Sequence, residues 1–85
     1  MRTAREIWAA TGEAVNLILN LRARWQDERE YEDIKDYLKP IQSLIPEATQ
    51  MHKRPFGFTA KASDGTIKIW VEIKSSGVEI KGKIA

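Results

Sequence analysis

The sequence of 85 residues has no cysteine and a single histidine, His52. The absence of cysteine excludes disulfide bonds, thiolate zinc sites and a cysteine nucleophile, and it fits a reducing compartment. One histidine without a second imidazole or thiolate does not predict a zinc site. The apolar runs of the N-terminal helical pattern, Ile7-Trp8-Ala9-Ala10 and Leu17-Ile18-Leu19, are far shorter than the roughly 20 residues that span a bilayer. We therefore expect a soluble, cytoplasmic protein with no membrane segment, no metal and no cofactor.

The charge is also modest overall, but it is unevenly distributed. Lysine and arginine number 14 against 12 acidic residues, which gives a formal net charge of +2. Residues 1–50 carry seven basic and nine acidic residues, whereas residues 51–85 carry seven basic and three acidic residues. The length suits one domain, which we assign to residues 1–85. The C-terminal part of this domain is therefore its cationic half.

The pattern of residues 4–25 predicts one long amphipathic helix. Its apolar stripe repeats at spacings of three and four residues through Ile7, Thr11, Ala14, Ile18, Leu21 and Trp25. Thr3 and Glu6 have the spacing of a capping box at its start. Further apolar residues widen the stripe at its edges, among them Trp8, Leu17 and Leu19.

The helical pattern loses its phase after this stripe, which predicts a break and a second helix. We expect Asp27 to cap this helix, with Glu30 at its third position. Its apolar residues are Tyr31, Ile34, Leu38, Ile41 and Ile45. Pro40 is expected to end or kink it near Lys39. A short helix within residues 41–52 completes the helical half, 4–52, and residues 51–55 form a basic linker.

From Phe56 onward the period changes to two, which predicts three strands within residues 56–84. Asp64-Gly65 and Ser75-Ser76-Gly77 predict the two tight turns of an antiparallel β-meander. We therefore predict an α+β fold, in which a long first helix and a kinked second helix pack on one face of a three-stranded antiparallel sheet. Three strands and one short helix leave part of the first helix uncovered, and such a surplus is often buried in a homodimer.

The opposite face of the predicted sheet is polar and rich in lysine. Alternation places Trp70 there together with Lys61, Lys68, Lys74 and Lys81. An exposed tryptophan is typical of a protein-binding anchor, whereas a tryptophan among lysines also fits stacking and phosphate contacts with single-stranded nucleic acid. Lysines on strand faces additionally keep small sheets from aggregating. These three interpretations stay open at the level of the sequence.

One short motif resembles a catalytic site. Asp64 followed by Glu72-Ile73-Lys74 is similar to the metal site of PD-(D/E)xK nucleases, in which carboxylates bind magnesium and a lysine helps to activate water. Here, however, Asp64 falls in a predicted tight turn, and a Glu-x-Lys pair arises on any charged strand face. The five glycines match neither a dinucleotide-binding nor a phosphate-loop spacing. We therefore expect neither an enzyme nor a small-molecule substrate.

These observations favour a non-enzymatic interaction module that acts through protein–protein contacts. We expect it to form a homodimer through the edge of the first helix, at Trp8, Leu17 and Leu19, and to bind a further protein partner near Trp70. The alternative is a nucleic-acid-binding accessory protein that uses the lysine-rich sheet face.

Overall fold

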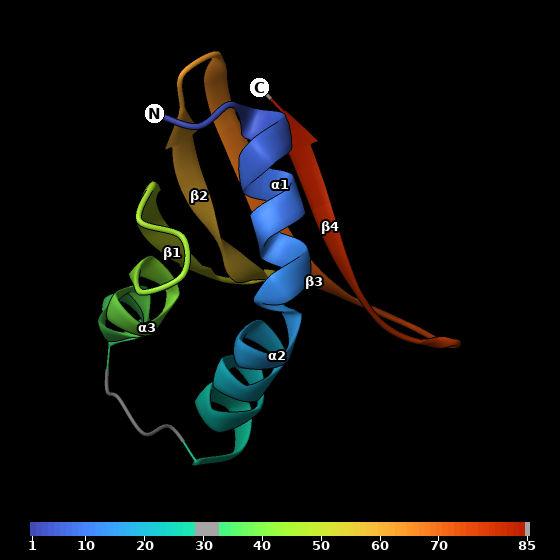
Figure 1. Ribbon diagram of the computed structural model, residues 1–85. Coiled ribbons are helices and arrows are strands. Elements are labelled where there is room, and N and C mark those ends of the chain that lie inside the picture. Colours follow the sequence, from blue (N-terminus) through green and yellow to red (C-terminus); the bar gives the residue numbers. More distant parts are fainter. Residues whose placement is uncertain (29–32, 85) are drawn as a thin grey trace.

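The computed structural model of the 85-residue chain describes residues 1–28 and 33–84. It is an α+β fold in which helices cover one face of a four-stranded antiparallel sheet (Figure 1). The helical elements are α1 (Ala4–Glu13), α2 (Val15–Ala23), the short π-helix η1 (Arg24–Glu28), the 3₁₀-helix η2 (Ile34–Tyr37) and α3 (Leu38–Gln42). The strands are β1 (Ala48–Lys53), β2 (Phe56–Ala62), β3 (Gly65–Lys74) and β4 (Gly77–Ile84). None of the described helices has the length and hydropathy needed to cross a membrane.

The predicted first helix is divided at Ala14 into α1 and α2. Ala14 leaves the helical geometry (φ −96°, ψ 2°), and its N–H donates to the carbonyl of Thr11 at 3.0 Å. The predicted apolar stripe nevertheless stays in phase across the break, because Ile7, Thr11, Ala14, Ile18 and Leu21 are all buried. The capping box at the start of α1 is confirmed by hydrogen bonds in both directions between Thr3 and Glu6.

The predicted second helix is not one helix but a series of short turns. Asp33 rather than Asp27 provides a cap, since its carboxylate accepts a hydrogen bond from the N–H of Lys35 at the start of η2. The predicted end near Lys39 is wrong, because Pro40 is the third residue of α3, where a missing N–H costs no intrahelical bond. The predicted contributions of Glu30 and Tyr31 lie outside the described residues.

The predicted three-stranded meander is correct over β2, β3 and β4, but it lacks the first strand. β1 occupies the last part of the region 41–52, which the sequence predicts to hold a short helix, and the beginning of the predicted basic linker. The register between β1 and β2 shifts between Ala48 and Gln50, so that only Ala48 and Met51 of this strand are buried. The two later turns are confirmed, and both use a glycine at positive φ, 141° at Gly65 and 136° at Gly77.

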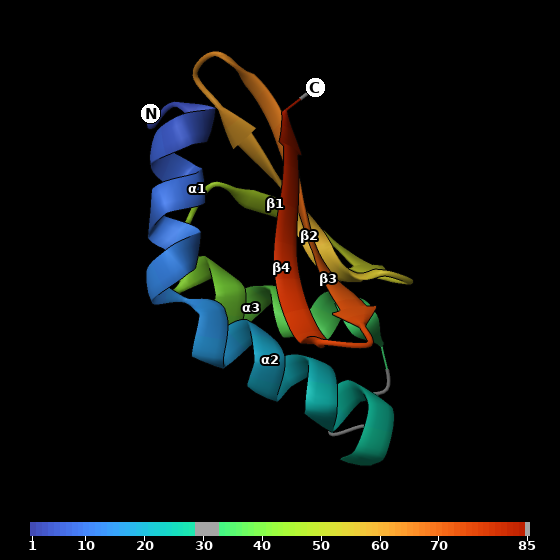
Figure 2. The same ribbon diagram turned by 90° about the vertical axis from the view of Figure 1, so that its right-hand side faces the viewer.

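The sheet has one buried and one polar face, as the alternation predicts. Phe58, Ile67, Ile69 and Val71 are buried beneath the helices, and Figure 2 shows the two layers from the side. Ile73 lies on the same face but is 63% exposed, because the β3–β4 hairpin projects beyond α2 (Figure 1). An aromatic cluster closes the other end of the core: the ring of Tyr37 stands edge-on to Trp25 at 5.7 Å and to Phe56 at 6.1 Å.

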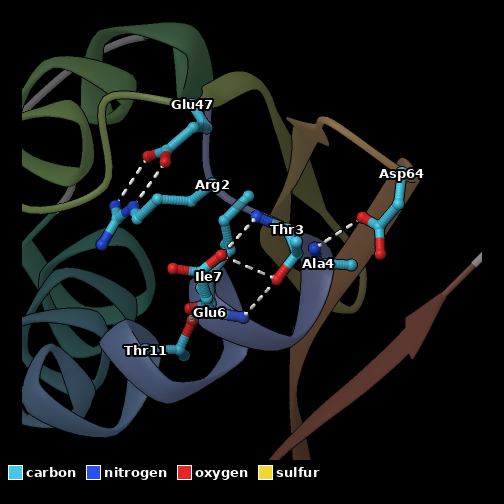
Figure 3. A network of polar contacts seen from close by, with 8 residues as sticks. All are labelled: Arg2, Thr3, Ala4, Glu6, Ile7, Thr11, Glu47 and Asp64. Carbon is cyan, nitrogen blue, oxygen red and sulfur yellow. Dashed lines mark hydrogen bonds and ion pairs between the residues drawn. The ribbon is translucent and has the colours of Figure 1, made fainter.

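Polar contacts hold the N-terminus of α1 against the sheet (Figure 3). The guanidinium of Arg2 binds the carboxylate of Glu47 through two hydrogen bonds, one of them 2.7 Å long. This bond holds the pKa of Glu47 below its ordinary value. The carboxylate of Asp64, in the β2–β3 turn, accepts a hydrogen bond from the N–H of Ala4 at 2.8 Å. These contacts fix how α1 lies on the sheet, and therefore where Trp8 stands.

Candidate interaction surfaces

The edge of β4 carries a row of backbone groups that face away from the sheet. The two-residue turn makes Lys74 and Gly77 the first bonded pair of the hairpin, and bonded pairs recur at every second residue. The N–H and C=O groups of Glu79 and Lys81 therefore face β3, whereas those of Val78, Ile80 and Gly82 face outward. Figure 2 views the molecule from this side, and no described element crosses in front of β4.

Apolar side chains line this edge on the helix-covered face of the sheet. Ile73 and Val78 are direct cross-strand partners, as are Val71 and Ile80, and Ile67 and Ile84. Val78 is 50% exposed and Ile84 58% exposed. We name the exposed or half-buried apolar set at this edge the β4 ledge, which consists of Trp8, Ile73, Val78, Ile80 and Ile84.

Trp8 connects α1 to the β4 ledge. A Cβ placed on Gly82 would lie 2.7 Å from Cζ3 of the Trp8 ring, so the ring fills the space above this glycine. One surface hollow on one side of the ring is lined by Gly12, Val15 and Ile80, and another on the other side by Ile67 and Ile84. With 42% of its surface exposed, Trp8 lines both hollows.

The polar face of the sheet gathers the lysines that the sequence predicts. Lys68 is the direct cross-strand partner of Lys83, and Trp70 is the partner of Lys81. Trp70 lies on the predicted face, but it is half-buried rather than fully exposed. Lys61 is exposed farther along β2, next to the turn. We name Lys61, Lys68, Trp70, Lys81 and Lys83 the lysine face.

Lys74 lies at the end of β3 and belongs to an ion cluster rather than to the middle of the lysine face. Its Nζ is 2.8 Å from Oε2 of Glu79, and Nζ of Lys81 is 3.7 Å from Oε1 of the same carboxylate. The hydrogen bond to Glu79 raises the pKa of Lys74 and lowers the pKa of Glu79. Glu79 therefore offsets part of the positive charge at this end of the sheet.

His52 lies on β1, at the opposite edge of the sheet. Its Nε2 is 2.6 Å from Oγ1 of Thr59 on the neighbouring strand. Burial lowers the pKa of His52, and the positive charge of Lys68 lowers it further. The predicted linker histidine is thus half-buried in the sheet.

The three residues predicted for self-association lie in different surroundings. Leu17 and Leu19 are half-buried on α2 and pack against the core, whereas Trp8 stands at the β4 edge. The structure thus brings Trp8 together with β4 rather than with the two leucines. A partner surface that includes Trp8 therefore extends along the sheet edge.

The residues of the nuclease-like motif are engaged separately. Asp64 bonds the N-terminus of α1 and Lys74 pairs with Glu79, while Glu72 is the cross-strand partner of Glu79. Over residues 1–28 and 33–84, no group of three or more His, Cys, Asp or Glu side chains is placed to hold a metal ion.

The sequence interpretation missed the open edge of β4. The sequence did carry a signal for the position of Trp8 at this edge. A glycine inside an alternating strand, here Gly82, often marks the close approach of another group, which in this structure is the Trp8 ring. No protein-family model, curated protein or solved structure matches this chain.

Proposed function

We propose that the protein is a non-enzymatic interaction module that binds a protein partner at the edge of β4. The observation that carries this proposal is the coincidence of an open strand edge with the β4 ledge. Unpaired strand edges bind other strands through backbone hydrogen bonds, and neighbouring apolar side chains add affinity and specificity.

The exposed apolar residues support this function because they are contiguous. Scattered apolar residues are normal on protein surfaces, but a continuous apolar patch beside an open edge is typical of an interface. Tryptophan is enriched among residues that dominate binding energies, and Trp8 lies between Ile80 and Ile84 on the ledge.

Site-specific photo-crosslinking tests the proposal. A photoreactive phenylalanine analogue at Val78 places the probe on the β4 ledge, and the same analogue at Lys35 provides a control on η2, which packs beside β1 and away from β4. Irradiation in the source cell should yield a discrete crosslinked protein from position 78 and none from position 35. Equal or absent crosslinking at the two positions would contradict the proposal.

A second candidate function is the binding of single-stranded nucleic acid at the lysine face. The specific observation is the direct pairing of Lys68 with Lys83, because like charges opposite each other destabilise a sheet and a bound phosphate would offset their repulsion. Trp70, two residues farther along β3 on the same face, offers a ring for base stacking.

Fluorescence anisotropy with a labelled mixed-sequence oligonucleotide tests this candidate. The affinity should fall steeply with added salt, as phosphates regain their counterions. The Lys68→Gln/Lys83→Gln variant should bind more weakly at low salt, whereas Lys35→Gln should bind like the parent protein. An unchanged anisotropy at low salt would eliminate this function.

A further inference from the structure

We infer that the partner of the β4 ledge is a second copy of this chain. The β4 strands of the two copies pair antiparallel, related by a twofold axis at Ile80. This inference rests on the proposed function, because it names the occupant of the same surface. The result would be a continuous eight-stranded sheet. Three features of β4 support it: the direction of its free backbone groups, its charge pattern and the position of Trp8.

The free backbone groups of β4 have the spacing that an antiparallel partner needs. With the axis at Ile80, this residue faces its own copy, and Val78 faces Gly82 of the second copy. These residues carry the outward N–H and C=O groups, so each pair exchanges two hydrogen bonds. The axis at Ile80 also pairs every residue from Gly77 to Lys83, which is almost the whole strand.

The charges of β4 select this register. With the axis at Ile80, Glu79 lies opposite Lys81 of the second copy, and the symmetry repeats this favourable pair. An axis at Glu79 or at Lys81 would place each of these residues opposite its own copy. An axis at Gly82 would place Lys81 opposite Lys83. A shift to an axis between residues would set apolar side chains opposite charged ones.

The same register joins the two β4 ledges. An antiparallel pair keeps the helix-covered faces of both copies on one side, so Ile80 packs beside Ile80 of the second copy. Val78 comes to lie beside Gly82 of the second copy, the position that the Trp8 ring of that copy covers. Because α1 packs mainly on β2 and β3, it stands back from the edge and leaves room for the added strand (Figure 1).

A charge-exchange experiment on the full chain tests this inference. In a dimer of Glu79→Lys, the new lysine of each copy lies opposite Lys81 of the other copy. In a dimer of Lys81→Glu, the new glutamate of each copy lies opposite Glu79 of the other copy. Each variant alone should dimerise at least about tenfold more weakly than the parent protein. In an equimolar mixture, each lysine of one variant faces a glutamate of the other, so a mixed dimer should form.

Light scattering and native mass spectrometry provide the readout. The parent protein should approach twice 9.7 kDa at micromolar concentrations, and the mixture should give a dimer that contains one copy of each variant. A parent protein that is monomeric at every concentration would overturn the inference. So would a dimer that both variants leave intact, or a mixture that stays monomeric while the parent dimerises.

Amide hydrogen exchange tests the same pairing in the parent protein alone, so the result does not depend on whether a variant folds. The amides of Val78, Ile80 and Gly82 should become more protected as the concentration rises, whereas those of Glu79 and Lys81 already face β3 and should change less. Exchange independent of concentration would contradict edge pairing. These results separate the inference from the proposed function. If the parent protein is monomeric but crosslinks at Val78 to another protein, the proposed function is kept and the pairing of two copies is overturned.

Discussion

The two edges of the sheet are built differently. β1 has six residues, its register with β2 shifts between Ala48 and Gln50, and η2 and α3 pack against it. The side-chain amide of Gln42, on α3, donates to the carbonyl of Ala48 on β1 at 2.9 Å. β4 has eight residues that pair with β3 without interruption, and its outer edge faces away from the helices.

Short length, bulges and covering elements are the usual means by which proteins protect a strand edge. β1 has an irregular register and covering elements, whereas β4 has neither and carries only the lysines on its polar face. A chain that protects one edge and leaves the other regular provides a place for an added strand. The comparison therefore supports the proposal that a partner binds at β4.

The largest expected effect comes from removing the side chain that anchors the elements beside β1. Tyr37 is fully buried between Trp25 and Phe56, so Tyr37→Ala should lower the free energy of unfolding by about 3–5 kcal/mol. Chemical denaturation measures this loss. The control, Lys35→Ala, changes an exposed residue of the same turn and should stay within about 0.5 kcal/mol. A loss below about 1 kcal/mol in Tyr37→Ala would show that the cover of β1 contributes little to stability.

A smaller loss of stability is expected from a glycine substitution in the interior of the sheet, which is compared below with one at its edge. In Gly57→Ala, the new methyl group would collide with the carbonyl of Ile69 and lie 2.5 Å from Cα of Trp70. Both are backbone atoms of β3, which cannot move without disturbing the sheet. We expect a loss of about 2–3 kcal/mol in denaturation experiments. Wild-type stability in this variant would mean that β2 and β3 are farther apart than described.

Much of this comparison could not be predicted from the sequence, for identifiable reasons. The stripe from Ile7 to Leu21 and the strands after Phe56 were predictable because their periods continue over many residues. β1 was not, because the shift between Ala48 and Gln50 breaks the alternation after a single repeat. Alternation predicts a face but not what covers it: Ile73 shares a face with the buried Ile69 and Val71, yet it is exposed because the hairpin extends beyond the helices.

The corresponding glycine-to-alanine substitution on β4 should lower the free energy of unfolding less than Gly57→Ala does. In Gly82→Ala, the methyl group would meet only the end of the Trp8 side chain, at 2.7 Å from Cζ3. This ring can rotate into solvent, so the loss should be about 1 kcal/mol or less. Tryptophan fluorescence should shift to longer wavelength as Trp8 becomes more exposed. A loss as large as that of Gly57→Ala would show that Trp8 is held as firmly as the interior of the sheet.

The smallest effect uses His52 to test the burial of β1. Since burial and Lys68 lower the pKa of His52 in the folded protein, the unfolded chain binds this proton more tightly, with the ordinary value of about 6.5. Above about pH 6.5, His52 therefore does not reduce the free energy of unfolding. This free energy decreases as the pH falls from about 6.5 toward the lower pKa that His52 has in the folded protein. His52→Gln keeps a polar group near Thr59 but does not titrate, so it should lose less stability than the parent between about pH 7.5 and 5.5. Carboxylates titrate in both proteins and cancel in the difference, and an NMR titration gives the His52 pKa directly. Equal pH dependence in the two proteins, with an ordinary histidine pKa, would mean that the His52 side chain on β1 is open to water.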